Sequence, residues 1–396
     1  MAAKLKQSNP LLFPFLLVFY EIATYLSNDM YLPALPQMMS DLKLSTQQAQ
    51  LTLTTWFVGS ACMPLIMGVI SERYGRRPVL LLGGLIYIIS TIVCAVSSNV
   101  YLLLIARVIE GSMVASVLVP GYACIHELYE QKEAIRILAL MGSISVLAPA
   151  FGPLLGSIVL YFVNWRGIFW IIAIWATIAI LLLRRWMPET LPVEKRHPVQ
   201  LGILFKHYRY ILTNKKFLLL MFVLGFIFCG FIAWITAGPL LVIENFHYSA
   251  IFFGVIQAIV FGAYIYGNRW VKLLLEKLGI IPLIRLGLGI TLCGGLLVLI
   301  AGLYFPNTLY PFLFGMMIYS FGSALCFSPL NRSIIEASSE PMGVRVALFA
   351  VFLTSFAVLG SGLASLFFNG SILSLSCIVA ISIILSCLMK LAYVFV

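Results

Sequence analysis

The chain alternates between long apolar runs and short polar breaks, and the runs predict helices. A helix needs about 20 consecutive apolar residues to cross a bilayer, and twelve runs reach about that length. Backbone polar groups inside a bilayer must be paired within the segment, so helices are the expected form. The predicted helices cover residues 10–35, 47–70, 79–98, 100–124, 134–161, 166–186, 217–242, 249–271, 281–303, 308–330, 343–368 and 371–395.

One polar stretch separates the twelve predicted helices into two sets of six. Residues 187–216 mix charged residues with Pro188, Pro192 and Pro198, a composition typical of a linker with room for a short surface helix. The expected fold is an all-α integral membrane protein with an N-terminal six-helix half (1–186), a cytoplasmic linker (187–216) and a C-terminal six-helix half (217–396). This layout predicts a substrate site near mid-membrane between the halves.

Composition excludes a soluble protein. Of the 396 residues, 62% are hydrophobic and only 10% are charged, and the mean hydropathy is +1.05. Such values are typical of a chain with many membrane-spanning segments. The eight cysteines are scattered through the apolar runs without C-x-x-C spacing, so they read as packing residues and not as a disulfide framework or a metal site.

The net charge of +11 is confined to alternate loops, which argues against nucleic-acid binding. This positive-inside pattern predicts a multi-pass protein of the cell membrane with both termini in the cytoplasm. The first apolar run is too long for a cleavable signal peptide and contains Glu21. The other loops carry only Lys43 and Arg166. The basic loops and ends contain Lys4, Lys6, Arg73, Arg76, Arg77, Lys132, Arg136, Arg184, Arg185, Lys195, Arg196, Lys206, Arg209, Lys215, Lys216, Arg269, Lys272, Lys277, Arg285, Arg332, Arg345 and Lys390.

The first predicted helix carries two carboxylates, Glu21 and Asp29. Eight residues of helix separate them by about 80° around the axis and roughly 12 Å along it, so both can face one cavity. Tyr25 lies four residues from each, and Asn28 precedes Asp29. Ionisable groups inside a membrane normally mark an ion or substrate path. The alternatives are a structural acid with a satisfied partner and a segment end in the headgroup region.

The fourth predicted helix adds Arg107 and Glu110, which lie on one face because they are three residues apart. This spacing leaves open whether Arg107 pairs with Glu110, Asp29 or Glu21, and whether the pair is a structural one. The second half has no comparable ionisable group near the middle of a predicted helix. The chemistry is therefore expected in the first half.

The turn from Gly68 to Pro78 resembles the G-x-x-x-D-R-x-G-R-R signature of the major facilitator superfamily, with Glu72 where Asp is usual. Gly68 would permit close helix approach, and Gly75 would permit the tight turn. The acid and its arginines would latch two helix ends on the cytoplasmic side in one of two states. The expected gating motif therefore contains Gly68, Glu72, Arg73, Gly75, Arg76 and Arg77.

Two further motifs strengthen this resemblance. The run from Arg107 to Gly111 looks like R-x-x-Q-G, with Glu110 replacing the Gln. The run from Ala148 to Ser157 is similar to the G-x-x-x-G-P-x-x-G-G motif of drug:proton antiporters. This run is the expected helix 5 motif, in which prolines would bend the helix and glycines would form a small-residue contact face. These residues are Pro149, Gly152, Pro153 and Gly156.

The run from Glu21 to Met30 resembles the E-x-A-T-Y-x-x-N-D-M run of MdfA-type multidrug antiporters, a match supported by Glu127 and by the run Met187 to Thr190. The resemblance implies proton-coupled efflux of lipophilic cationic or neutral compounds by alternating access across the bacterial inner membrane, and hence antibiotic resistance. Substrate and proton would compete for the helix 1 carboxylates. The alternative is a dedicated carrier of a metabolite or siderophore, because one fold serves many substrates.

The resemblance also implies roles for particular residues. Proton coupling would involve Asp29, Glu21, Arg107 and Glu110, and substrate would contact Tyr25, Asn28, Asp29 and Glu21. No catalytic residue, cofactor or metal is expected. The run His126 to Glu130 lacks the second His of H-E-x-x-H, and there is no G-x-S-x-G or P-loop motif, which argues against an enzyme. The expected partners are small-molecule substrate, protons and lipid, for a monomer.

Overall fold

The computed structural model describes residues 11–196 and 201–394, and each regular element in these ranges is a helix. Lys4, Lys6, Pro198 and both chain ends, on which part of the topology prediction depends, lie outside the described residues. Nine of the described helices are long and apolar enough to cross a membrane, and ten qualify if the bent helix α4 counts as one span. The all-helical membrane fold is confirmed, while the count of twelve stays a prediction.

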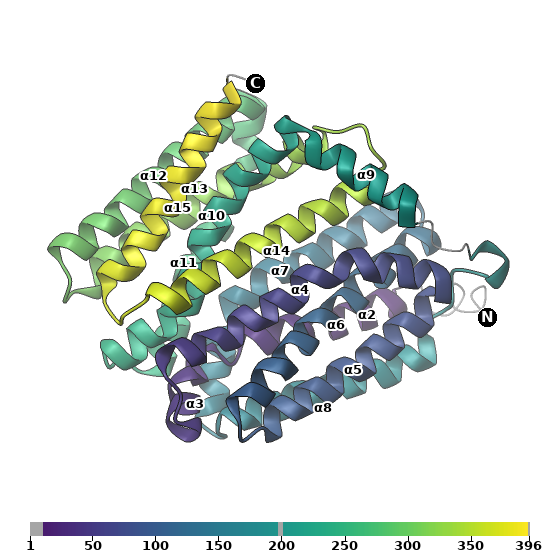
Figure 1. The fold of residues 1–396 in the computed structure, drawn as a ribbon, viewed down its shortest axis with the longest axis horizontal. Helices are drawn as coiled ribbons and strands as arrows, with labels where there is room; N and C mark the ends of the chain where they lie inside the picture. Colours follow the sequence, from purple (N-terminus) through teal and green to yellow (C-terminus); the bar gives the residue numbers. More distant parts are fainter. Residues whose placement is uncertain (1–10, 197–200, 395–396) are drawn as a thin grey trace. The chain divides into compact units, whose positions relative to one another are not determined.

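The first half of the chain forms seven α-helices (Figure 1). The bundle of long helices is built by the packing of α2 against α7 and α8, and of α5 against α6 and α8. The helices are α2 (Leu12–Asp29), α3 (Leu35–Leu42), α4 (Thr46–Tyr74), α5 (Arg76–Val96), α6 (Val100–Leu128), α7 (Gln131–Leu160) and α8 (Trp165–Trp186).

The first spanning helix is shorter than the predicted range 10–35. Helix α2 ends at Asp29, and a 3-10 turn over Leu32–Ala34 leads into α3. Pro33 and Pro36 lie in this region, and proline has no amide hydrogen with which to continue a helical ladder. Asp29 therefore occupies the last position of α2 and not the interior of a longer helix.

The second half contains a short helix followed by six long ones. The short helix α9 lies in the predicted linker. A π-helical turn, η3, follows α10 directly. The helices are α9 (Leu201–Thr213), α10 (Lys215–Pro239), η3 (Leu240–Asn245), α11 (Ala250–Leu278), α12 (Ile280–Tyr304), α13 (Leu309–Ile335), α14 (Met342–Phe367) and α15 (Ile372–Val394). Here α12 packs against α13 and α15, while α10 packs against α14 and α15.

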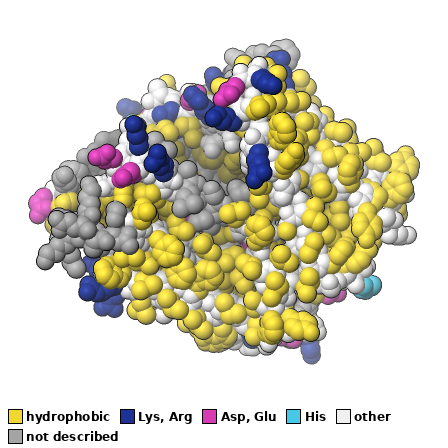
Figure 2. Space-filling view, turned by 180° about the vertical axis from the view of Figure 1, so that it is seen from behind, with side chains coloured by type: hydrophobic (Ala, Val, Ile, Leu, Met, Phe, Trp, Pro, Cys, Tyr) yellow, Lys and Arg dark blue, Asp and Glu magenta, His cyan; other side chains and the backbone are white. Residues whose placement is uncertain are grey.

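Hydrophobic side chains occupy both the inner and the outer faces of the helices. On α8, Ile168, Ile172 and Ala176 are buried, whereas Ile174 and Leu181 are 58% and 57% exposed. In Figure 2 hydrophobic side chains cover most of the visible face, and most of the visible Lys and Arg side chains gather in its upper part. A helix that is apolar all round fits a bundle whose outer surface contacts lipid.

The same sharp turn joins two pairs of helices. Gly75 (φ 102°) separates α4 from α5, and Gly279 (φ 81°) separates α11 from α12. Each glycine stands in the pattern E-[KR]-x-G-x-x-P, and its positive φ is a conformation that residues with a side chain rarely adopt. The two residues after the glycine differ, because the first copy has two arginines and the second has two isoleucines.

The chain divides into two compact units, residues 1–37 with 55–200 and residues 38–54 with 201–396. The first turns of α4 therefore cluster with the second half of the chain. Within that unit, Thr54 Oγ1 lies 2.7 Å from Ser361 Oγ and 3.2 Å from Ser365 Oγ. Thr236 Oγ1 donates to Ser361 Oγ at 3.1 Å, so hydroxyl groups of α4, α10 and α14 form one cluster.

Candidate functional site

All buried charged side chains of the described residues lie in the first compact unit. They are Glu21, Asp29, Arg76, Arg107 and Glu110. Helix α2 supplies the first two, α5 supplies Arg76, and α6 supplies the last two. Buried charge is stable only when it is paired, hydrogen-bonded or neutralised, so the partners of each group indicate what the site can do.

Arg107 forms an ion pair with Glu110 along helix α6. Its Nη1 lies 2.6 Å from Glu110 Oε2, and both side chains are 0% exposed. Thr91 of α5 donates from Oγ1 to Glu110 Oε1 at 2.9 Å. Of the three acids that the sequence left open as partners of Arg107, the structure selects Glu110 for the direct contact.

Arg107 also reaches helix α2 through hydrogen bonds. Its Nη1 donates to the Ser27 carbonyl oxygen at 3.2 Å, and its Nη2 donates to Asn28 Oδ1 at 3.0 Å. Asn28 Nδ2 in turn donates to Asp29 Oδ1 at 3.4 Å. The guanidinium carbon lies 4.6 Å from the centre of the Tyr31 ring, in a cation–π contact. The side chain of Asn28 therefore links the Arg107 guanidinium to the Asp29 carboxylate.

Glu21 has a partner that sequence reasoning missed. Tyr122 of α6 donates from its hydroxyl to Glu21 Oε1 at 3.0 Å. Glu21 Oε2 is buried and has no hydrogen-bond partner among the described residues. No motif or spacing marks Tyr122 in the sequence, because it lies 15 residues beyond Arg107 and outside every recognised pattern. Tyr25, expected beside Glu21, is half-buried on α2.

The glycines of the expected helix 5 motif contact the end of α2. A Cβ placed on Gly152 would lie 2.6 Å from Asp29 Cβ, and one on Gly156 would lie 1.8 Å from the Met30 carbonyl oxygen. Helix α7, which also contains Pro149 and Pro153, can approach α2 this closely only because these positions lack side chains. The motif therefore forms the wall of the site beside Asp29.

Glycines also permit the close crossing of α4 and α6 next to Arg107. A Cβ on Gly111 would lie 2.0 Å from the Trp56 carbonyl oxygen, and one on Gly59 would lie 2.0 Å from the Val108 carbonyl oxygen. Small residues on both helices are a common way for membrane helices to approach each other. Gly111 of the R-x-x-E-G run thus has a packing role at the level of the ion pair.

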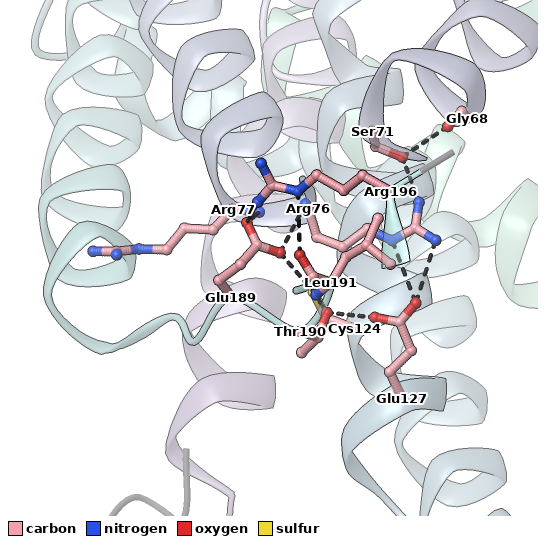
Figure 3. A network of polar contacts seen from close by, with 10 residues as sticks. All are labelled: Gly68, Ser71, Arg76, Arg77, Cys124, Glu127, Glu189, Thr190, Leu191 and Arg196. Carbon is pink, nitrogen blue, oxygen red and sulfur yellow. Dashed lines mark hydrogen bonds and ion pairs between the residues drawn. The ribbon is translucent and has the colours of Figure 1, made fainter. Parts of the chain in front are cut away.

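The expected gating motif forms a polar network different from the one its sequence suggests (Figure 3). Glu72 is exposed and makes no ion pair with any described residue. Arg76 instead contacts Glu127 at the end of α6, with Nη2 3.2 Å from Oε1, and donates from Nη1 to Ser71 Oγ at 2.7 Å. Gly68 shows no close approach, because the nearest atom to a Cβ there would be 3.8 Å away.

The segment that follows α8 completes this network. Glu189 accepts the backbone amides of Arg76 at 3.0 Å and Arg77 at 3.2 Å, and thereby caps the N-terminus of α5. Arg196 Nη2 lies 3.7 Å from Glu189 Oε2, and Arg77 Nη2 donates to the Arg184 carbonyl oxygen at 2.6 Å. Glu189, an acid of the linker, thus binds the first backbone amides of α5 (Figure 3).

Bilayer-length helices with buried ionisable groups are typical of membrane transporters. Residues 17–365 match the family model of the Major Facilitator Superfamily, and the chain belongs to this superfamily. The family and the fold imply a transporter and not an enzyme. Among the described residues, no group of three His, Cys, Asp or Glu side chains could hold a metal ion.

The chain is similar to several bacterial transport and resistance proteins. It is 32% identical over 336 residues to the multidrug transporter MdfA of Escherichia coli O6:H1, covering 84% of this chain and 81% of that protein. Identity to the MdfA of Yersinia pestis bv. Antiqua is 29% over 354 residues, with coverage of 89% and 86%. Identity to the chloramphenicol resistance protein CraA of Acinetobacter baumannii is 30% over 348 residues, with coverage of 87% and 84%.

Solved structures share the fold. A POT family transporter in complex with 5-aminolevulinic acid superposes with a TM-score of 0.74 at 14% identity, covering 96% of this chain and 95% of that one. The human organic anion transporter MFSD10 superposes with a TM-score of 0.67 at 18% identity, covering 98% and 100%. At these identities the likeness supports the major facilitator fold alone.

Proposed function

We propose that this transporter exports lipophilic cationic or neutral compounds in exchange for protons, as a multidrug antiporter of the bacterial inner membrane. The names of its relatives, two of which are about 30% identical multidrug and chloramphenicol-resistance proteins, support the substrate class. The observation that carries the proposal is an imbalance of charge. Glu21 and Asp29 are buried without an ion pair in the described structure, while Arg107 is paired with Glu110.

Two unpaired acids can take up either a proton or a cationic substrate. An ionised carboxylate in an apolar site is unfavourable by several kcal/mol unless positive charge compensates it. A proton supplies that compensation, and so does the ammonium or aromatic cation of a substrate. Because one carboxylate cannot accept both, protonation from outside would release the substrate, and deprotonation inside would permit the next binding event.

Of the two acids on α2, Asp29 is the better placed to couple protonation to the Arg107–Glu110 pair. Arg107 bonds to Asn28, and Asn28 bonds to Asp29, so a change of charge on Asp29 alters the environment of the Arg107–Glu110 pair. Glu21, with its free Oε2 and with Tyr25 one helical turn away, would serve mainly as a substrate contact. Glu110 would act as a coupling residue through its ion pair with Arg107.

The gating and helix 5 motifs would support the conformational cycle. Arg76 and Arg77 form separable contacts with Glu127 and Glu189, so this network can open without breaking a helix. The Gly152 contact on Asp29 couples α7 to the acid. Both termini and the basic loops would lie in the cytoplasm, where the membrane potential favours inward movement of positive charge by about 2.3 kcal/mol per charge per 100 mV.

Proton release in unbuffered detergent solution tests the proposal. Tetraphenylphosphonium is added to purified wild type, Asp29→Asn, Glu21→Gln and Glu133→Gln, the last being an exposed acid at the start of α7. Competition predicts release from wild type and Glu133→Gln and its loss in at least one variant of the buried acids. Tight binding without release in all four proteins would contradict the antiport proposal and favour a dedicated metabolite or siderophore carrier.

A further inference from the structure

A cavity of about 320 Å³ lies within the second compact unit, whereas the buried acids belong to the first. It lies between the α3–α4 region, the turn η3 and the turn between α14 and α15. The cavity lies near the start of α11 and the end of α14. Arg269 and Arg345 lie toward the opposite ends of these two helices. Its principal lining residues are Met39, Thr46, Leu240, Glu244, Asn245 and Phe368.

Three polar side chains of this cavity have no partner. Glu244 is exposed, and neither it nor the side chains of Asn245 and Thr46 makes a hydrogen bond or ion pair within the described ranges. A carboxylate, an amide and a hydroxyl group therefore line one space without a protein partner in the described ranges. Polar groups that converge on a cavity with some apolar side chains can orient and bind a small molecule.

The local backbone explains how these groups come together. Helix α10 ends at Pro239 and continues as the wider π-helical turn η3, a form often found at functional sites. Glu244 and Asn245 are its last two residues. Gly370, with φ 88°, lets the turn after α14 approach so closely that a Cβ there would lie 2.5 Å from Asn245 Nδ2.

The chemistry of the walls selects the ligand. Met39, Leu240 and Phe368 supply thioether, aliphatic and aromatic contacts, and an aromatic ring also attracts a cation. Glu244 repels anions and provides a single carboxylate, which is too few oxygen ligands for a tightly bound metal ion. Asp41 and Lys43, both exposed in the preceding segment, carry opposite charges and leave the negative charge of Glu244 dominant.

We propose that this cavity binds a small organic monocation with apolar substituents, with Glu244 as its counter-charge. The site would hold exported compound at the outer end of the transport path. That last step rests on the proposed export function and on the orientation that the basic loops predict. Binding itself depends on neither, so the two proposals can fail separately.

The test uses a cysteine reporter in the cavity wall. Asn369→Cys introduces a thiol at an exposed lining position, and a maleimide labels it in detergent-purified protein, with the parent protein as background. Benzyltrimethylammonium is the probe, and neopentylbenzene is its uncharged analogue of the same shape. Each is tested with Glu244 intact and with Glu244→Gln.

The expected result is slower labelling with benzyltrimethylammonium and no protection with neopentylbenzene. Glu244→Gln is expected to raise the half-protecting concentration by about fivefold, the scale of one solvent-accessible ion pair. Equal protection in Glu244→Gln would overturn the proposed counter-charge, and absence of protection by the cation would overturn the site. If Asn369→Cys folds poorly, the labelling rate is measured at Thr46→Cys, another lining position.

A second labelling experiment tests whether cation binding in this cavity depends on the buried acids of the proposed transport mechanism. The same labelling is repeated with Asp29→Asn, which removes an acid of the membrane core. Unchanged protection supports a site independent of the core, whereas loss of protection in Asp29→Asn overturns it. Protection of the wild type together with no proton release from the wild type would refute the antiport proposal and leave the cation site standing.

Discussion

Arg107 Nη1 lies 2.6 Å from Glu110 Oε2, and neither side chain is exposed. The R-x-x-Q-G motif that this run resembles would place a neutral amide where this chain has a carboxylate. The result is a neutral pair held inside one helix. Removing either partner would leave the other as an unpaired buried charge, whose penalty is about 3–5 kcal/mol.

A double-mutant cycle measures this dependence. Arg107→Ala and Glu110→Ala are each expected to lower the free energy of unfolding by about 3–5 kcal/mol, since each leaves one buried charge. The double variant should be less destabilised than the sum of the two, because it leaves none. Denaturant unfolding in detergent gives the three values. Simple additivity would mean that the two charges do not interact as the geometry indicates.

Helix α7 offers a matched pair of glycine substitutions. Gly156→Ala would place a Cβ 1.8 Å from a backbone oxygen, while Gly142 has no atom within 4 Å of the equivalent position. Gly156→Ala should destabilise the protein by about 1–3 kcal/mol through overpacking. Gly142→Ala should stabilise it by up to about 1 kcal/mol through helix propensity. Equal unfolding temperatures for both variants would contradict the contact with α2.

Tyr122 is expected to act on substrate binding through Glu21. Tyr122→Phe removes the hydroxyl that donates to Glu21 Oε1 at 3.0 Å. A hydrogen bond to a charged group is worth about 1.5–3 kcal/mol, so binding of tetraphenylphosphonium should weaken by at least about tenfold. In a Glu21→Gln background the same substitution should have little effect. A full tenfold loss in that background would show that Tyr122 acts independently of Glu21.

The cap of α5 distinguishes the roles of Glu189 and Glu72. Glu189→Ala removes the acceptor for the Arg76 and Arg77 amides and should cost about 1 kcal/mol of stability, as for other helix caps. Glu72→Ala, at the acid of the motif itself, should be nearly neutral because Glu72 makes no ion pair in the described structure. Thermal unfolding in detergent compares the two. The reverse order of effects would refute this assignment of the cap.

Much of the fold was predictable because bilayer-length apolar runs and basic loops leave strong patterns in the sequence. The end of α2 at Asp29 was not predicted, since the apolar run continues across Pro33 and hides the break. The Arg107–Glu110 contact was one of three options that spacing allowed. The contacts of Tyr122 and Glu189 could not be predicted from the sequence, because their partners lie 101 and 113 residues away along the chain.

The paired turns at Gly75 and Gly279 bear on how the two halves respond to their surroundings. Both turns have a glycine with positive φ, but only the first is followed by two arginines. Arg76 contacts Glu127, and Glu189 accepts the Arg76 backbone amide. Salt weakens the attraction between exposed charges, with a Debye length of about 10 Å at 0.1 M, and weakens partly buried pairs less. The isoleucines after Gly279 carry no charge that salt could screen. High ionic strength should therefore weaken the contacts of the turn at Gly75 slightly, since the Arg76–Glu127 pair is partly buried, and leave the turn at Gly279 unchanged.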